Sequence, residues 1–220
     1  MEDQMNLVRP RLKAPRAAAI AGIVFSVLFI TTLVLVRISV PYDPREAGNW
    51  LPENWRTVSF AMSLVPFAGI AFMWFMAVLR DRVTYEDRFF DTVFLGSGFL
   101  FLAMLFISSA LALAVIMIYG SAPALVNESG IYRFARALIY QIMHVYAMRM
   151  AGVFMFLTCT LSLRAGMFPR WMSFMGFVLA ALLLLSGGHM QWTPLVFPLW
   201  IMLISVYILF VNLKTRPVAN

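Results

Sequence analysis

The sequence predicts an all-α, polytopic membrane helix bundle, and three observations lead to this fold class. Of the 220 residues, 62% are hydrophobic and only 12% are charged, whereas a typical soluble domain has about 25% charged residues. The apolar residues gather in six stretches, and a helix needs about 20 apolar residues to cross a bilayer. The cations stand mainly between these stretches, where positive charge sets the orientation of a membrane protein. We therefore expect six transmembrane helices.

The first three expected helices cover residues 17–36, 58–79 and 89–119. The first is longer than the hydrophobic part of a signal peptide, so we expect it to be retained. Residues 41–56 contain three prolines and two tryptophans, which favours a loop or a short helix at the headgroup level over one continuous helix. Pro66 is expected to bend the second helix. The third is so long that it must tilt or protrude.

The last three expected helices cover residues 131–163, 171–185 and 194–213. The fourth ends at a basic turn. The fifth is followed by Gly187 and Gly188, which favour a break in the helix. Because the fifth stretch is short, five spans with a re-entrant segment at 171–185 remain an alternative.

The distribution of cations predicts the topology. Six spans bring both termini to the same side of the membrane. That side carries eleven cations: Arg9, Arg11, Lys13, Arg16, Arg80, Arg82, Arg88, Arg164, Arg170, Lys214 and Arg216. The other side carries five: Arg37, Arg45, Arg56, Arg133 and Arg136. Because positive charge marks the cytoplasmic side, we expect a cytoplasmic basic arm at 1–16, a six-helix transmembrane domain at 17–213 and a cytoplasmic tail at 214–220.

The fourth stretch is unusual because it carries arginine and histidine far from its ends. At 100° per residue, a helix places Arg133, Arg136, Tyr140 and His144 on one stripe, with Gln141 beside it. A helix that is polar on more than one side cannot turn a whole flank to lipid. We therefore expect neighbouring helices or a wet cavity around most of it. The candidate ligands for an anion are Arg136, Tyr140, Gln141 and His144.

Arg149 lies off this stripe and close to the middle of the membrane, about 20 Å along the axis from Arg136. Tyr146 precedes it by one turn. No acidic residue lies deep in any other span, so hydroxyl groups, carbonyls, water or a bound anion must balance the charge. Two interpretations stay open: Arg149 and Tyr146 contact an anionic ligand, or Arg149 bonds backbone carbonyls near Pro66 or the glycines.

The sequence favours no cofactor and no metal. His144 and His189 are its only histidines, and both would have to lie at one height to ligate a haem. His144 is expected about a third of the way in from the outside, whereas His189 lies at the outer end of its span, so the heights disagree. The single Cys159 lies within an apolar stretch and cannot form a disulfide or a thiolate cluster within one chain.

Small residues in the third stretch predict close helix contacts. They are Gly96, Ser97, Gly98, Ser108 and Ser109. Ser97 between two glycines has the setting of an intramembrane protease nucleophile, but it is expected near the cytoplasmic end, while His144 lies in the outer half. Without a base within reach, helix packing is the favoured role, and no catalytic residue is predicted.

Four segments together resemble small six-span membrane proteins of bacteria whose function is unknown. They read RAAAIAGIVFSVLFI, LVPFAGIAFMWF, VYAMRMAG and LVFPLW. Between the second and the third, the chain also contains RDR followed by EDRFFDTVFLGSG. The resemblance covers nearly the whole chain and implies a location in the bacterial inner membrane. It transfers no catalytic residue.

These observations favour a protein without enzymatic chemistry of its own. The leading hypothesis is an accessory subunit that packs into or regulates a larger membrane assembly and that binds lipid, with other membrane subunits or a second copy as partners. The alternative is a small carrier or channel for an anionic or amphipathic solute, which would use the polar residues of the fourth helix. An enzyme that modifies lipid is the third. The net charge of +7 is assigned to topology and anionic headgroups, not to nucleic acid.

Overall fold

A computed structural model describes residues 14–41, 51–80, 88–121, 130–186 and 192–214, and nearly all of them are helical. The elements are α1 Ala14–Ser39, α2 Leu51–Arg80, α3 Arg88–Ser121, α5 Ile131–Tyr140, η1 Gln141–Ala147, α6 Met148–Ala165, α7 Arg170–Leu185 and α8 Thr193–Lys214. The η1 segment is a π-helix that joins α5 to α6 without a break. Most of the basic arm, most of the tail and His189 lie outside the described residues.

Five helical stretches are long and apolar enough to cross a membrane. They are Arg16–Ser39, Leu51–Arg80, Phe89–Ser121, Ile131–Ala165 and Thr193–Val211. The prediction of a helical membrane bundle is therefore confirmed at this level. The sixth apolar helix, α7, has 16 residues and a length of about 24 Å, less than the roughly 30 Å of a hydrocarbon core. The count of six spans and the side of the termini stay predictions.

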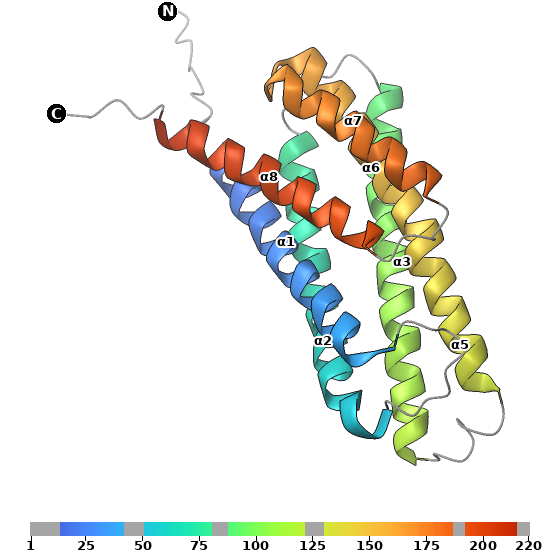
Figure 1. Cartoon of the computed structure of the whole chain (residues 1–220). Coiled ribbons are helices and arrows are strands. Elements are labelled where there is room, and N and C mark those ends of the chain that lie inside the picture. Colours follow the sequence, from blue (N-terminus) through green and yellow to red (C-terminus); the bar gives the residue numbers. More distant parts are fainter. Residues whose placement is uncertain (1–13, 42–50, 81–87, 122–129, 187–191, 215–220) are drawn as a thin grey trace, which may run out of the picture.

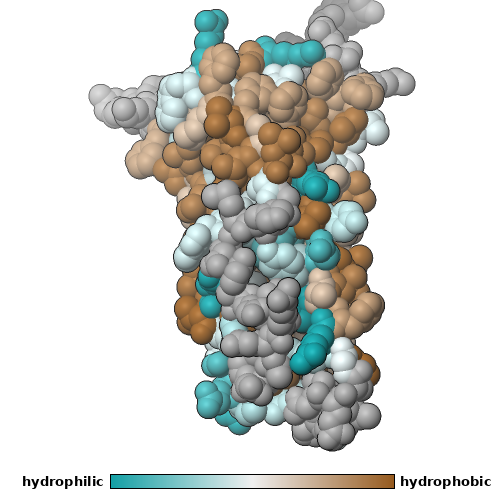
Figure 2. All heavy atoms as spheres, turned by 45° about the vertical axis from the view of Figure 1, so that its right-hand side comes forward, coloured by the Kyte–Doolittle hydropathy of each residue, from teal (hydrophilic) through white to brown (hydrophobic). Residues whose placement is uncertain are grey.

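The helices form two groups that meet along α2 and α3 (Figure 1). In the first group, α1 packs against α2 and α8; in the second, α6 packs against α3 and α7. The start of α1 and the end of α8 lie at the same end of the bundle (Figure 1). Hydrophobic side chains dominate the upper part of the face in Figure 2, and hydrophilic ones appear among them lower down.

A cluster of phenylalanine rings joins the two groups. Phe72 of α2 lies at its centre, with ring centroids 4.8 Å from Phe25, 5.4 Å from Phe101, 5.2 Å from Phe154 and 5.7 Å from Phe197. These rings come from α1, α3, α6 and α8, and all five side chains are fully buried. Aromatic pairs prefer tilted or edge-to-face contacts at such distances. The cluster therefore holds five helices together.

Polar contacts mark the end of the bundle where α2 ends and α3 begins. Arg80 donates two hydrogen bonds to the carboxylate of Asp91, at 2.8 and 2.7 Å. The guanidinium of Arg164 lies 4.5 Å from the ring centroid of Phe90. Just beyond it, Gly166 caps the end of α6, and its φ of 62° suits a residue without a side chain. These cations belong to the side that the sequence assigns to the cytoplasm.

The start of α2 differs from the expected position. The helix begins at Leu51, seven residues before the expected position 58, so residues 51–56 are helical and not part of a loop. Pro52 is compatible with a first helical turn, because its missing N–H has no partner there anyway, and Glu53 favours the positive end of the helix dipole. The helix also continues through Pro66. Residues 42–50 lie outside the described residues.

The small residues of α3 take different places. A Cβ added at Gly98 would lie 2.1 Å from the sulfur of Met76, whereas one added at Gly96 would meet nothing within 4 Å. Ser97 is buried and donates a hydrogen bond to the carbonyl of Phe94. Gly98 therefore lies at a close helix contact, while Gly96 lies in open space.

Candidate functional site

The continuous helix from Ile131 to Ala165 changes its winding in the middle, at η1. A π-helix has a wider turn than an α-helix, is rare, and is frequent at functional sites. The rings of Tyr140 and His144, at the α5–η1 junction, stack with centroids 4.2 Å apart and planes 12° apart. The two rings thus lie face to face, and both side chains line a cavity together with residues of α1.

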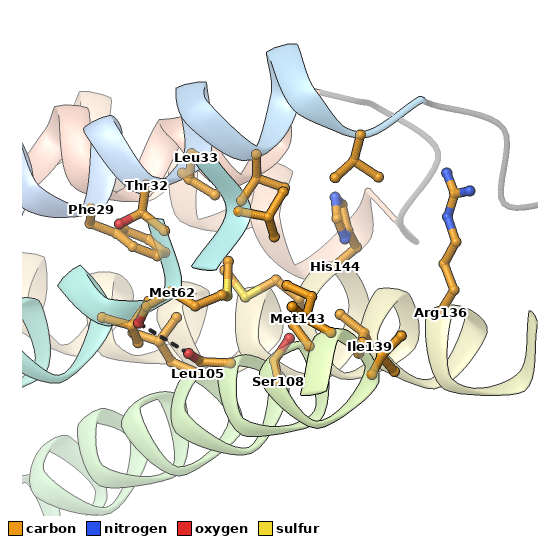
Figure 3. Close-up of a pocket in the computed structure, with 18 of the residues that line it drawn as sticks. Phe29, Thr32, Leu33, Met62, Leu105, Ser108, Arg136, Ile139, Met143 and His144 are labelled. Carbon is orange, nitrogen blue, oxygen red and sulfur yellow. Dashed lines mark hydrogen bonds between the residues drawn. The ribbon is translucent and has the colours of Figure 1, made fainter. Parts of the chain in front are cut away.

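A narrow cavity of about 170 Å³ lies between α1, α2, α3 and α5–η1. Figure 3 shows Phe29 and Leu105 toward one end and Arg136 at the other, with His144 between them. Phe29 belongs to the aromatic cluster, since its ring centroid lies 5.5 Å from that of Phe25. The cavity therefore runs from the core of the bundle toward the end of α1.

The wall of this narrow cavity is almost entirely apolar. Thr32 and Ser109 line it, but their hydroxyl groups donate hydrogen bonds to α2: Thr32 to the carbonyl of Ala61 at 3.2 Å, and Ser109 to that of Met62 at 3.3 Å. An apolar cavity of similar size in another protein stays dry and binds small hydrocarbons. This cavity thus suits a hydrocarbon group better than water.

A second, wider cavity of about 270 Å³ adjoins the first. The two share six lining residues: Leu33, Val36, Val40, Arg136, Ile139 and His144. The wider cavity is also lined by Arg37, Tyr140 and Trp192. The two cavities therefore adjoin along one wall; the end of this site at the narrow cavity is apolar, and the end at Arg37 and Trp192 is polar.

Two guanidinium groups lie at the polar end. Arg136 donates hydrogen bonds to the carbonyl of Pro41 and, at 3.3 Å, to the hydroxyl of Tyr132. Arg37 lies 5.7 Å from the ring centroid of Trp192. No acidic side chain is among the described residues that line either cavity. Two cationic side chains therefore belong to the described wall of the polar end.

The six candidate ligand residues of the fourth span separate into two groups. Arg136, Tyr140 and His144 line the wider cavity. Gln141, Tyr146 and Arg149 have exposed side chains and line neither cavity. Ser108 and Ser109, expected at helix contacts, both line the narrow cavity.

Arg37 and Trp192 were not among the residues expected at the site. Arg37 was assigned to topology because it ends the first apolar stretch, and Trp192 precedes the last one. They lie 155 positions apart in the sequence, and only the pairing of α1 with α8 brings them together. An arginine and a tryptophan at the ends of two apolar stretches are a weak signal that could have suggested a shared outer site.

Among the described residues, no three histidine, cysteine or acidic side chains lie close enough to hold a metal ion. No protein-family model matches the chain, and no curated protein or solved structure is significantly similar to it. The fold and the cavities thus define the class of protein: a multi-pass helical membrane protein with an amphipathic internal site.

Proposed function

We propose that this protein binds an anionic amphiphile, a molecule with a hydrocarbon chain and an anionic head. The observation that carries the proposal is the shared wall between an apolar cavity and a cavity with two guanidinium groups. A fatty acid, a lipid with a phosphate head or a similar amphipathic solute has this distribution of polarity. Such binding is the step that a carrier for an amphipathic anion needs.

The hydrocarbon chain would occupy the narrow cavity. Most of its lining residues are apolar, and the hydroxyl groups of Thr32 and Ser109 already donate hydrogen bonds. Each methylene that leaves water for such a site contributes about 0.8 kcal/mol. An amphiphile that leaves a bilayer gains less, so the fit of the chain and the contacts of the head must supply selectivity.

The anionic head would lie against Arg136 and Arg37. Arginine presents several N–H groups in a plane and binds phosphate or carboxylate with two parallel hydrogen bonds. The Nδ1 atom of His144 is buried and has no partner of ordinary geometry among the described residues. A ligand oxygen or a water molecule between the head and His144 would satisfy this atom.

Filling the narrow cavity should abolish binding without harming the fold. Ala112 lines this cavity, so Ala112→Leu adds volume where a ligand chain would lie. In wild type, dodecyl phosphate should raise the melting temperature in detergent, as a ligand that binds only the folded state does. Ala112→Leu should lose most of this shift. Ala114→Leu, on the exposed side of the same helix, is the matched control and should keep it; equal shifts in all three proteins would contradict the proposal.

A second function, the accessory role in a larger membrane assembly, is favoured by a different observation. Arg149 is exposed on the outside of the bundle near the middle of its span. An arginine at the centre of a membrane helix costs about 2.5 to 3.5 kcal/mol on insertion scales. A partner that covers this residue would remove part of the cost.

We also propose six spans, both termini in the cytoplasm and a location in the bacterial inner membrane. The asymmetry of cations supports this orientation. The contact between Arg37 at the end of α1 and Trp192 at the start of α8 supports a crossing by α7, since α6 ends beside Phe90 at the opposite end.

Cysteine labelling tests this topology. In a variant whose buried Cys159 is replaced by alanine, a membrane-impermeant maleimide should label Ser121→Cys and Trp192→Cys in intact cells. It should label Ala165→Cys only after permeabilisation. Protection of Trp192→Cys in intact cells would show that α7 re-enters and does not cross.

A further inference from the structure

The outward face of η1 and α6 is polar where a membrane helix should be apolar. Gln141, Tyr146 and Arg149 all have exposed side chains on it, and Tyr146 is 54% exposed. None of the three lines a cavity. We call this set the polar face.

Arg149 of the polar face lies at the depth of the hydrocarbon core. Arg149 precedes Arg164 by 15 residues, or about 22 Å of helix. Arg164 lies at the end of the bundle that carries the Arg80–Asp91 ion pair. On the other side, about 20 Å separate Arg149 from Arg136. The hydrocarbon core is about 30 Å thick. If either Arg164 or Arg136 lies at a surface of this core, Arg149 lies inside it.

The described part of the chain does not neutralise Arg149. Within the part of the chain that the structure describes, its side chain makes no hydrogen bond or ion pair. The described acidic residues are Glu53, in the first turn of α2, and Asp91, which is paired with Arg80. An unpaired cation in hydrocarbon is costly, and ionisable groups at this depth usually pair with one another or line a wet cavity.

We propose that the polar face docks a transmembrane helix of another protein, and that this helix presents an aspartate or glutamate to Arg149. The inference rests on the accessory role proposed above and is independent of the amphiphile site. Val145 and Val153, one turn before and after Arg149, are only partly buried, so a helix can pack there while the carboxylate meets the guanidinium. Gln141 and Tyr146 would add hydrogen bonds across the contact.

Charge complementarity selects this partner over a second copy. A two-fold interface would bring one Arg149 toward the other, and like charges in a medium of low dielectric constant repel strongly. No apolar stretch of this chain carries an acidic residue in its middle. A carboxylate at the depth of Arg149 must therefore come from a different protein.

Photocrosslinking in the membrane of the source cell tests the inference. A photoreactive amino acid at Val153 should crosslink a second protein, and the same amino acid at Phe67, exposed on α2, serves as the control for the other side of the bundle. In the Val153 background, Arg149→Gln should reduce the crosslinked product at least tenfold, whereas Arg149→Lys should retain it. Arg133→Gln removes an exposed cation of α5 and should have no effect. The melting temperature of purified Arg149→Gln should stay at the wild-type value, because the side chain is exposed.

The crosslinked segment of the partner completes the test. It should be a membrane helix with an aspartate or glutamate, and replacing that residue by asparagine or glutamine should reduce the product to the same extent as Arg149→Gln. If a partner protein is crosslinked equally well with and without Arg149→Gln and the substitution of its own acidic residue, the inference is wrong, but the accessory role remains supported. Crosslinks only to a second copy would overturn the inference alone, and crosslinks only to lipid would overturn the inference and the accessory role together.

Discussion

Replacing Phe72 by alanine should destabilise the protein more than any other single truncation considered for it. The ring contacts four others from α1, α3, α6 and α8, and its loss leaves a cavity where these helices meet. At about 24 cal/mol per Å³ for a cavity of roughly 100 Å³, the expected loss is about 2 to 3 kcal/mol. In detergent or lipid this packing term dominates, because the unfolded side chain also meets an apolar solvent.

Phe67→Ala is the matched control for this prediction. Phe67 lies in the same helix but is 62% exposed, so its truncation leaves no internal cavity. Unfolding by SDS in mixed micelles, followed by circular dichroism, should separate the two variants clearly. Equal stability of Phe72→Ala and Phe67→Ala would mean that the five helices do not meet at this cluster.

The second large effect concerns the recognition of the anionic head. Arg136→Gln should weaken the binding of dodecyl phosphate by about 10- to 100-fold, since a hydrogen bond to a charged group contributes about 1.5 to 3 kcal/mol. Binding of the uncharged dodecyl maltoside should change little. Arg136 also donates a hydrogen bond to the carbonyl of Pro41, so its loss could disturb the wall of the cavity. The comparison of the two amphiphiles separates this disturbance, which would weaken the binding of both, from the loss of charge, which weakens only that of the phosphate.

Arg133→Gln is the control for Arg136→Gln. Arg133 lies on α5, is exposed and lines neither cavity, so its loss removes the same formal charge at a distance from the site. Isothermal titration calorimetry in a nonionic detergent would give the affinities. Equal weakening by both substitutions, or equal weakening for both amphiphiles, would argue against a head group at Arg136.

The class of helical membrane proteins could be predicted because the share of hydrophobic residues and the length of the apolar stretches determine it directly. The helix that carries the candidate site residues was also foreseen, since arginine and histidine inside a membrane-length stretch are rare. The separation of Arg149 from the stripe of Arg136 and His144 was expected from the angle between residues, and Arg149 is exposed while His144 is half-buried.

The cavities and the π-helix could not be predicted in the same way. A calculation at 100° per residue assumes α-helical winding, and it has no signal for the wider turn of η1. The volume between four helices depends on how the side chains of α1, α2 and α3 fit together, which no single stretch reveals. Likewise, α2 begins at Leu51 because Pro52 fits the first turn of a helix. The prolines and tryptophans of residues 41–56 had instead favoured a loop or a short helix.

The most direct test of the central claim is photolabelling with an anionic amphiphile that carries a diazirine at the end of its hydrocarbon chain. The molecule would be an alkyl phosphate, added to the protein in lipid nanodiscs, and the labelled residues would be found by peptide mass spectrometry. The account predicts labels on the inner lining of the narrow cavity, at Phe29, Met62 or Leu105, and competition by unlabelled dodecyl phosphate. Labels confined to side chains on the outside of the bundle, such as Phe67 and Met117, without competition, would contradict it.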